Sequence, residues 1–77
     1  TVVIIGLTTD HCVSTTTRMA ANYGYDTFLI SDATATFNKV GINEETYDSE
    51  LMHQTALASL KDEFAIIISS KEFFKIF

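Results

Sequence analysis

Cys12, the only cysteine of this 77-residue chain, is the residue whose type and setting are best suited to chemistry. It follows the apolar run VVII at residues 2–5 and stands within the polar stretch TTDHCVST. A cysteine thiolate is a nucleophile, so this position is a candidate for covalent catalysis. The alternative is a small buried hydrophobe, because free cysteine is among the most buried residue types. A phosphate site is a weaker alternative, since GLTTDH lacks the glycines and the Lys of a P-loop.

Three polar residues precede the cysteine and are candidates for lining a pocket. His11 is adjacent to Cys12, but neighbouring helical residues diverge by about 100°, so we do not expect the two side chains to face each other. Asp10 is expected to cap the following helix rather than to act as a catalytic acid. Thr9 is expected to brace the turn.

The elements that position Cys12 are a buried strand and a helix. The continuous β-branched residues 2–5 predict a strand covered on both faces, as in a parallel sheet, with Gly6 at its end. A helix is predicted from His11 to Tyr23, with Asp10 as its N-cap and Gly24 as its C-terminal stop. The cysteine therefore lies at the carboxyl end of the strand and in the first helical turn.

The rest of the chain repeats this alternation. Residues 26–31 predict a second strand, 32–46 a polar loop, 47–62 a helix and 64–68 a third strand. The order strand, helix, strand, helix, strand predicts an α/β fold with a parallel sheet. The tail SKEFFKIF, residues 70–77, is rich in Phe, and we expect it to be buried as a docked final helix or in a subunit contact.

The junction that holds Cys12 is the usual place for a ligand in such a fold. Ligands bind beyond the carboxyl ends of parallel strands, and the free N–H groups of a helix start stabilise a thiolate or a developing oxyanion. Asp32 ends the second strand at the same edge, where we expect it to form structural hydrogen bonds. His53 shares a helical face with apolar residues and is expected to be packed and hydrogen-bonded rather than a metal ligand.

Composition narrows the class of partner. The net charge is −5, with ten acidic and five basic residues and no basic cluster, which argues against nucleic acid or an anionic membrane surface. No apolar run is long enough to span a bilayer. A single cysteine fits a reducing, cytoplasmic compartment. The chain is 47% hydrophobic and begins without Met in a core strand, so we expect it to be the C-terminal part of a longer polypeptide.

The stretch GLTTDHCVSTTTRMAANYGYDTFLISDATATF resembles the nucleophile region of the isochorismatase-like cysteine hydrolases. Its matched positions follow the family pattern in order: Gly6, Thr9, Cys12, Val13, Thr16, Ala20, Gly24, Tyr25, Asp32 and Ala33. The likeness continues through ELMHQTALASLKDEFAIII, up to about Ser69. This resemblance implies that residues 1–77 are the C-terminal part of one Rossmann-like α/β/α hydrolase domain. Of its parallel sheet the chain would supply about three strands and two to three helices.

The resemblance also implies an activity. Members that cleave carbon–nitrogen bonds keep the cysteine, so this sequence resembles an amidase-type member that forms a thioester with a small amide or carbamoyl substrate. Cys12 matches the nucleophile. The family's catalytic Asp and Lys have no counterpart here, so a chain of these residues alone is expected to be inactive without the N-terminal segment. No cofactor is implied, and we assign no metal, because the ligands of metal-containing nicotinamidases belong to the absent half.

In the family a cis peptide bond precedes the cysteine, and here it falls at Leu7-Thr8. It would turn the Thr8 N–H toward the substrate, to form an oxyanion hole with the Cys12 N–H. Family members commonly assemble, so a homo-oligomer is expected. Two alternatives stay open: a non-catalytic binding or assembly module of the same fold, and a thiol redox or sensor protein in which Cys12 is oxidised.

Overall fold

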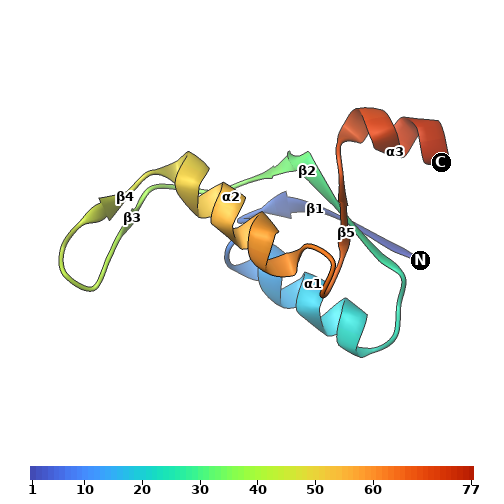
Figure 1. Cartoon of the computed structure of the whole chain (residues 1–77), viewed down its shortest axis with the longest axis horizontal. Helices are drawn as coiled ribbons and strands as arrows, with labels where there is room; N and C mark the ends of the chain where they lie inside the picture. Colours follow the sequence, from blue (N-terminus) through green and yellow to red (C-terminus); the bar gives the residue numbers. More distant parts are fainter.

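A three-stranded parallel sheet organises the chain, and the computed structural model describes all of its residues, 1–77. In chain order the elements are β1 (Val2–Leu7), α1 (Cys12–Asn22), β2 (Thr27–Ala35), β3 (Lys39–Val40), β4 (Thr46–Tyr47), α2 (Ser49–Leu60), β5 (Ile66–Ile68) and α3 (Ser70–Ile76). The central strand is β2, which pairs in parallel with β1 on one side and β5 on the other. The predicted α/β fold with a parallel sheet is confirmed (Figure 1).

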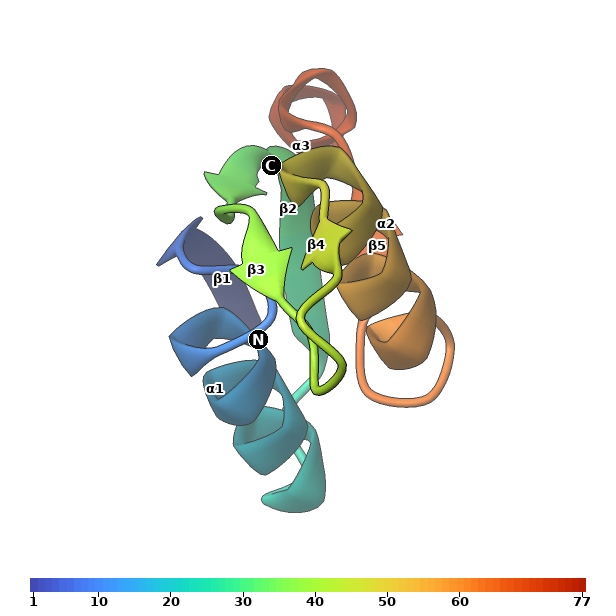
Figure 2. The ribbon, with the colours of Figure 1, turned by 90° about the vertical axis from the view of Figure 1, so that its left-hand side faces the viewer.

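Helices cover both faces of this sheet. On one face, Ile4 of β1 and Leu29 of β2 pack with the buried apolar residues of α1, α2 and the following turn, which are Val13, Leu57, Leu60 and Ala65. On the other face, Ile30 of β2 lies beside Phe73 of α3. The sheet is thus the middle of three layers, with α1 and α2 on one side and α3 on the other (Figure 2).

The first strand is longer than predicted. We expected Gly6 to end it, but β1 continues to Leu7. Gly6 adopts a φ of +125°, a backbone conformation that other residues rarely adopt, and this lets the strand continue through an irregularity in its pairing with β2. The extra strand residues bring the following turn to the edge of the sheet.

The second strand and the loop after it also differ from the prediction. The strand extends to Ala35, because Thr34 and Ala35 pair with the continuation of β1. Within the segment predicted as a polar loop, β3 and β4 form a small antiparallel hairpin, with Lys39 opposite Tyr47. This hairpin projects from one end of the molecule (Figure 1). Its strands are only two residues long, too short for a periodicity that the sequence would reveal.

The three helices begin in different ways. The prediction that Asp10 caps α1 is wrong: the N-cap residue is His11, and no side chain caps this helix. Asp48 caps α2 by accepting a hydrogen bond from the Glu50 N–H, and Ser69 caps α3. The tail forms the predicted final helix, but within this chain the helix is not buried, since none of its residues is buried. None of the three helices has both the length and the apolar character needed to cross a bilayer.

Candidate functional site

Cys12 is the first residue of α1, directly after the turn that leaves β1. Its side chain is exposed. The Thr8 carbonyl shapes the turn by accepting hydrogen bonds from the N–H groups of His11 (3.0 Å) and Val13 (3.2 Å). The thiol therefore lies at the carboxyl end of the strand, as predicted, and its exposure rules out the alternative of a buried cysteine.

His11 contacts the thiol, which the sequence argument did not anticipate. Its Nδ1 lies 3.3 Å from Sγ of Cys12. The prediction that these side chains do not face each other is wrong, because the 100° divergence holds only between helical residues. His11 has a non-helical backbone (φ −124°, ψ −104°), which turns its ring toward its neighbour. The pair can share a proton: a thiol donates to a neutral ring, or a protonated ring donates to a thiolate.

The peptide bond between Leu7 and Thr8 is cis, as the resemblance implies. Beyond this bond the N–H groups of Thr8 and Cys12 make no hydrogen bond to another backbone group. The Thr9 N–H, in contrast, donates to the Ala35 carbonyl of β2 at 3.0 Å. Two backbone donors near the thiol are thus not used by the main chain.

Thr9 is fully buried and ties the turn to the second strand. Its Oγ1 lies 2.7 Å from Nδ1 of His53, and Nε2 of His53 lies 3.1 Å from the Ser31 carbonyl oxygen. Because a carbonyl only accepts, Nε2 carries a proton, and in a neutral ring Nδ1 then accepts from the Thr9 hydroxyl. The predicted roles are confirmed: Thr9 braces the turn, and His53 is packed and hydrogen-bonded.

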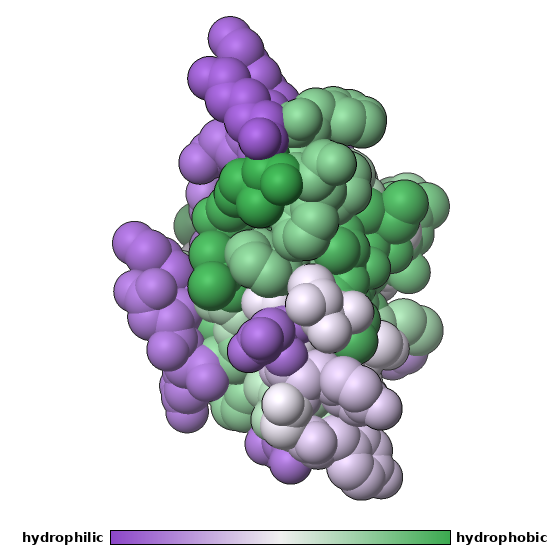
Figure 3. Space-filling model, turned by 90° about the vertical axis from the view of Figure 1, so that its right-hand side faces the viewer, coloured by the Kyte–Doolittle hydropathy of each residue, from purple (hydrophilic) through white to green (hydrophobic).

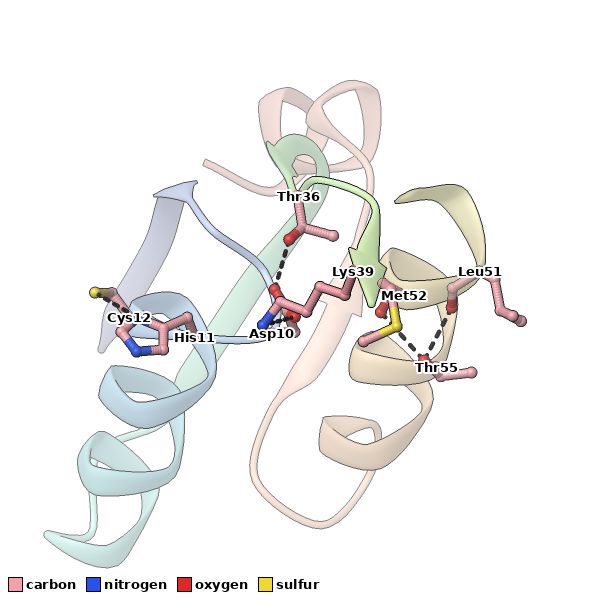
Figure 4. A network of polar contacts seen from close by, with 8 residues as sticks. All are labelled: Asp10, His11, Cys12, Thr36, Lys39, Leu51, Met52 and Thr55. Atoms are coloured by element: carbon pink, nitrogen blue, oxygen red, sulfur yellow. Dashed lines mark hydrogen bonds and ion pairs between the residues drawn. The ribbon is translucent and has the colours of Figure 1, made fainter. Parts of the chain in front are cut away.

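Asp10 attaches the turn to the segment that follows β2 (Figure 4). Its Oδ2 lies 2.7 Å from Nζ of Lys39, and its Oδ1 accepts a hydrogen bond from Oγ1 of Thr36. Burial raises the pKa of this carboxyl, but the hydrogen bonds from Lys39 and Thr36 outweigh it and hold the pKa below its ordinary value. Asp10 is therefore an ionised anchor and not the proposed helix cap.

Asp32 has the structural role that was predicted for it. Its carboxylate accepts hydrogen bonds from the N–H and the hydroxyl of Ser70, both at 2.7 Å, at the start of α3. These bonds hold the pKa of the Asp32 carboxyl below its usual range. No group of three or more His, Cys, Asp or Glu side chains lies close enough together to hold a metal ion.

Sequence reasoning missed Thr36 and Lys39, which were assigned to a polar loop. A signal for them was present, since residues that follow neighbouring parallel strands meet at one edge of the sheet. Asp10 follows β1, and Thr36 and Lys39 follow β2. An acidic residue and a lysine at that edge are candidates for an ion pair.

Comparison with known proteins agrees with this geometry. The family model of the isochorismatase domain matches residues 1–72. The chain belongs to the isochorismatase family. It is 57% identical over 72 residues to the uncharacterized isochorismatase family protein YrdC of Bacillus subtilis, a match that covers 94% of this chain and 38% of YrdC. It is 36% identical over 67 residues to Nicotinamidase 3 of Arabidopsis thaliana, covering 87% of this chain and 28% of that protein.

Solved structures of the isochorismatase family share the fold. A family member from Chromobacterium violaceum superposes with a TM-score of 0.91 at 29% identity, and one from Oleispira antarctica with a TM-score of 0.90 at 29% identity. Each match covers 95% of this chain and 38% of the other. The chain thus spans well under half the length of the relatives that it matches.

Proposed function

We propose that this chain carries the nucleophile of an isochorismatase-family hydrolase that cleaves a carbon–nitrogen bond of a small amide or carbamoyl compound. The observation that carries the proposal is the setting of Cys12: an exposed thiol beside His11, on a turn where the N–H groups of Thr8 and Cys12 have no backbone acceptor. The similarity to a nicotinamidase supports an amide as the substrate class.

The proposed reaction has two steps. The Cys12 thiolate attacks the carbonyl carbon, the C–S bond forms, and the carbonyl electron pair moves to oxygen. The N–H groups of Thr8 and Cys12 donate to this oxyanion. As it collapses, the C–N bond breaks, and the nitrogen takes a proton from the acid that the N-terminal segment would supply and leaves as ammonia or an amine. Water then attacks the thioester, the C–S bond breaks, and the acid and the thiolate are released.

The chain supplies only part of this machinery. His11 contacts the thiol, and its Nδ1 can donate a hydrogen bond to the sulfur when that nitrogen carries a proton. The lysines of the chain do not contact Cys12: Lys39 pairs with Asp10, and the resemblance gives the catalytic Asp and Lys no counterpart here. We propose that an N-terminal segment of the same domain completes the site. The exposed apolar side chains Ile5 and Leu7 of the edge strand β1 are a surface for that segment.

Substitution of the nucleophile tests the proposal. In the full-length protein, Cys12→Ser should lower kcat/KM on a panel of primary amides and carbamoyl compounds at least about a thousandfold, because the weaker hydroxyl nucleophile replaces the thiolate. Thr15→Ala, an exposed change in the same helical turn, is the matched control and should leave kcat/KM unchanged. A Cys12→Ser protein with wild-type turnover would rule out the thioester route.

A second candidate role, self-assembly, is favoured by a specific surface. Apolar side chains gather on the end of the molecule that carries α3 and the N-terminus (Figure 3). Phe74 and Phe77 of the tail are 78% and 61% exposed. A contiguous exposed apolar surface of this kind is typical of protein contacts. We therefore propose that α3 contributes to a contact between copies of the full-length protein.

Oligomeric state tests this contact. Phe74→Asp in the full-length protein should lower the mass measured by light scattering toward that of a monomer, because it places a charge in the apolar contact. Ile42→Asp, a change of the same kind on the remote hairpin, should leave the mass unchanged. A wild-type protein that is monomeric would contradict the proposed assembly.

A further inference from the structure

The turn that carries Cys12 has two sides with opposite character. Cys12 and His11 point to one side and are exposed, whereas Asp10 points away from them, toward the hairpin (Figure 4). The side chain of Asp10 is only 10% exposed, and its two oxygens contact Lys39 and Thr36. On the side of the turn opposite Cys12, the ion pair of Asp10 with Lys39 thus attaches the turn to the hairpin.

The partners of Asp10 are themselves held in place. Lys39 belongs to β3, which pairs with β4. Between the two partners, Asn38 accepts a hydrogen bond from the Ser49 N–H at 2.7 Å through its Oδ1, at the start of α2. The segment that receives Asp10 is therefore attached both to the hairpin and to the second helix, so it can fix the position of the turn.

Stability alone is a poor explanation for this ion pair. The side chain of Lys39 is 46% exposed, and an ion pair that water reaches in this way adds little to stability, because solvent screens the two charges. Oriented charged hydrogen bonds, in contrast, define a geometry. Asp10 is two residues from Cys12 and one residue from Thr9, whose hydroxyl is bound to His53. Any movement of the carboxylate is passed to the thiol through the intervening backbone.

We propose that Asp10 is a positioning residue, which through Lys39 and Thr36 holds the Cys12 thiol and the N–H groups of Thr8 and Cys12 in their reactive geometry. This inference rests on the proposed hydrolase function and goes beyond it by assigning a role to Asp10, on the side of the turn opposite Cys12. Displacement of a reacting group by about 1 Å can cost a hundredfold in rate. The substrate contacts the side of the turn that carries Cys12 and does not contact Asp10. Loss of the Asp10 contacts should therefore lower kcat and leave KM unchanged.

The test compares Asp10→Asn, Lys39→Met and Lys39→Arg in the full-length protein. Two rates are measured: amide hydrolysis and alkylation of Cys12 by iodoacetamide. We expect Asp10→Asn and Lys39→Met to lower kcat and the alkylation rate about tenfold each, with KM within about twofold of wild type. Lys39→Arg should restore most of both rates, because it keeps the charge. The double variant should be no slower than the worse single variant, since both changes break one contact.

Two controls separate positioning from stability. Ser69→Ala removes the cap of α3, which does not contact the segment that holds Asp10, and should lower the melting temperature without changing the alkylation rate. Lys61→Met removes a lysine that forms no ion pair and should change neither. The proposal is overturned if Asp10→Asn and Lys39→Met alkylate at the wild-type rate, or if Lys39→Arg is as slow as Lys39→Met. If no amide is hydrolysed, the proposed function fails, but the alkylation rates still decide whether Asp10 positions the thiol.

Discussion

The beginnings of α1 and α3 make an instructive pair, because each helix follows a strand of the same parallel sheet. At α3, Ser69 and Glu72 form a reciprocal capping box, and the Asp32 carboxylate accepts both the N–H and the hydroxyl of Ser70. At α1, His11 provides no side-chain cap, and the first turn contains no acidic residue. One helix start is closed by side-chain hydrogen bonds, whereas at the other no side chain accepts from the first turn and, among the N–H groups of residues 12–14, only that of Val13 has an acceptor, the Thr8 carbonyl.

Under the proposed function, the start of α3 has a structural role and the start of α1 a chemical one. The N–H groups of the first helical turn need acceptors from outside the helix, and a capping side chain normally supplies them at a gain of about 1 kcal/mol. The sequence forgoes that gain at the one helix start that holds the cysteine. An uncapped start leaves donors for an incoming carbonyl oxygen, so we expect substitutions at α1 to change activity and those at α3 to change stability.

Apart from the loss of Cys12 itself, the largest effect at the two helix starts is expected at His11. In the full-length protein, His11→Ala should lower kcat/KM on an amide substrate about tenfold, because it removes the hydrogen-bonding partner of the Cys12 sulfur. The melting temperature should hardly change, since His11 is exposed and caps nothing. Steady-state kinetics together with thermal unfolding measure both quantities.

Ser69→Ala is the matched control at the closed helix start. It removes the acceptor for the Glu72 N–H and should lower the free energy of unfolding by about 1 kcal/mol, with kcat/KM unchanged. The contrast between the two helix starts would be wrong if Ser69→Ala impaired catalysis as much as His11→Ala, or if His11→Ala were the more destabilising change.

A smaller, pH-dependent effect is expected at Asp32. The hydrogen bonds from Ser70 lower the pKa of this carboxyl in the folded state, so its contribution to stability is present above the unfolded pKa, near 3.9. That contribution is lost as the pH falls through the lower folded pKa. Asp32→Asn should therefore melt slightly below wild type at neutral pH, and the difference should shrink as the pH falls below about 4. A difference that grew in acid would contradict this assignment.

Much of the fold could be predicted from residue patterns. The β-branched run of β1 and the alternation of strands and helices indicated a parallel sheet, and Gly24 marked the end of the first helix. The extension of β1 through Gly6 could not be predicted, because it depends on pairing with Thr34 of β2. The hairpin was missed because each of its strands has two residues.

The sequence predicted where Cys12 lies but missed the residues that contact it and hold its turn, and the role of Cys12 as nucleophile stays a prediction. The place of Cys12 at the helix start followed from its position in the sequence and from the family resemblance, whereas its exposure is a finding of the structure. The contact of His11 with the thiol depends on a non-helical backbone at His11, which residue types do not reveal. Asp10 was assigned to a local cap because its partners Thr36 and Lys39 are distant in sequence, and only the sheet brings them together.

The central claim is that Cys12 is acylated during turnover. The most direct measurement is mass spectrometry of the full-length protein after acid quenching during hydrolysis of an amide. The account predicts a peptide containing Cys12 that gains the mass of the substrate's acyl group and loses it on treatment with hydroxylamine. Hydrolysis by the wild-type protein with no adduct on this peptide, together with wild-type activity of Cys12→Ser, would contradict the account.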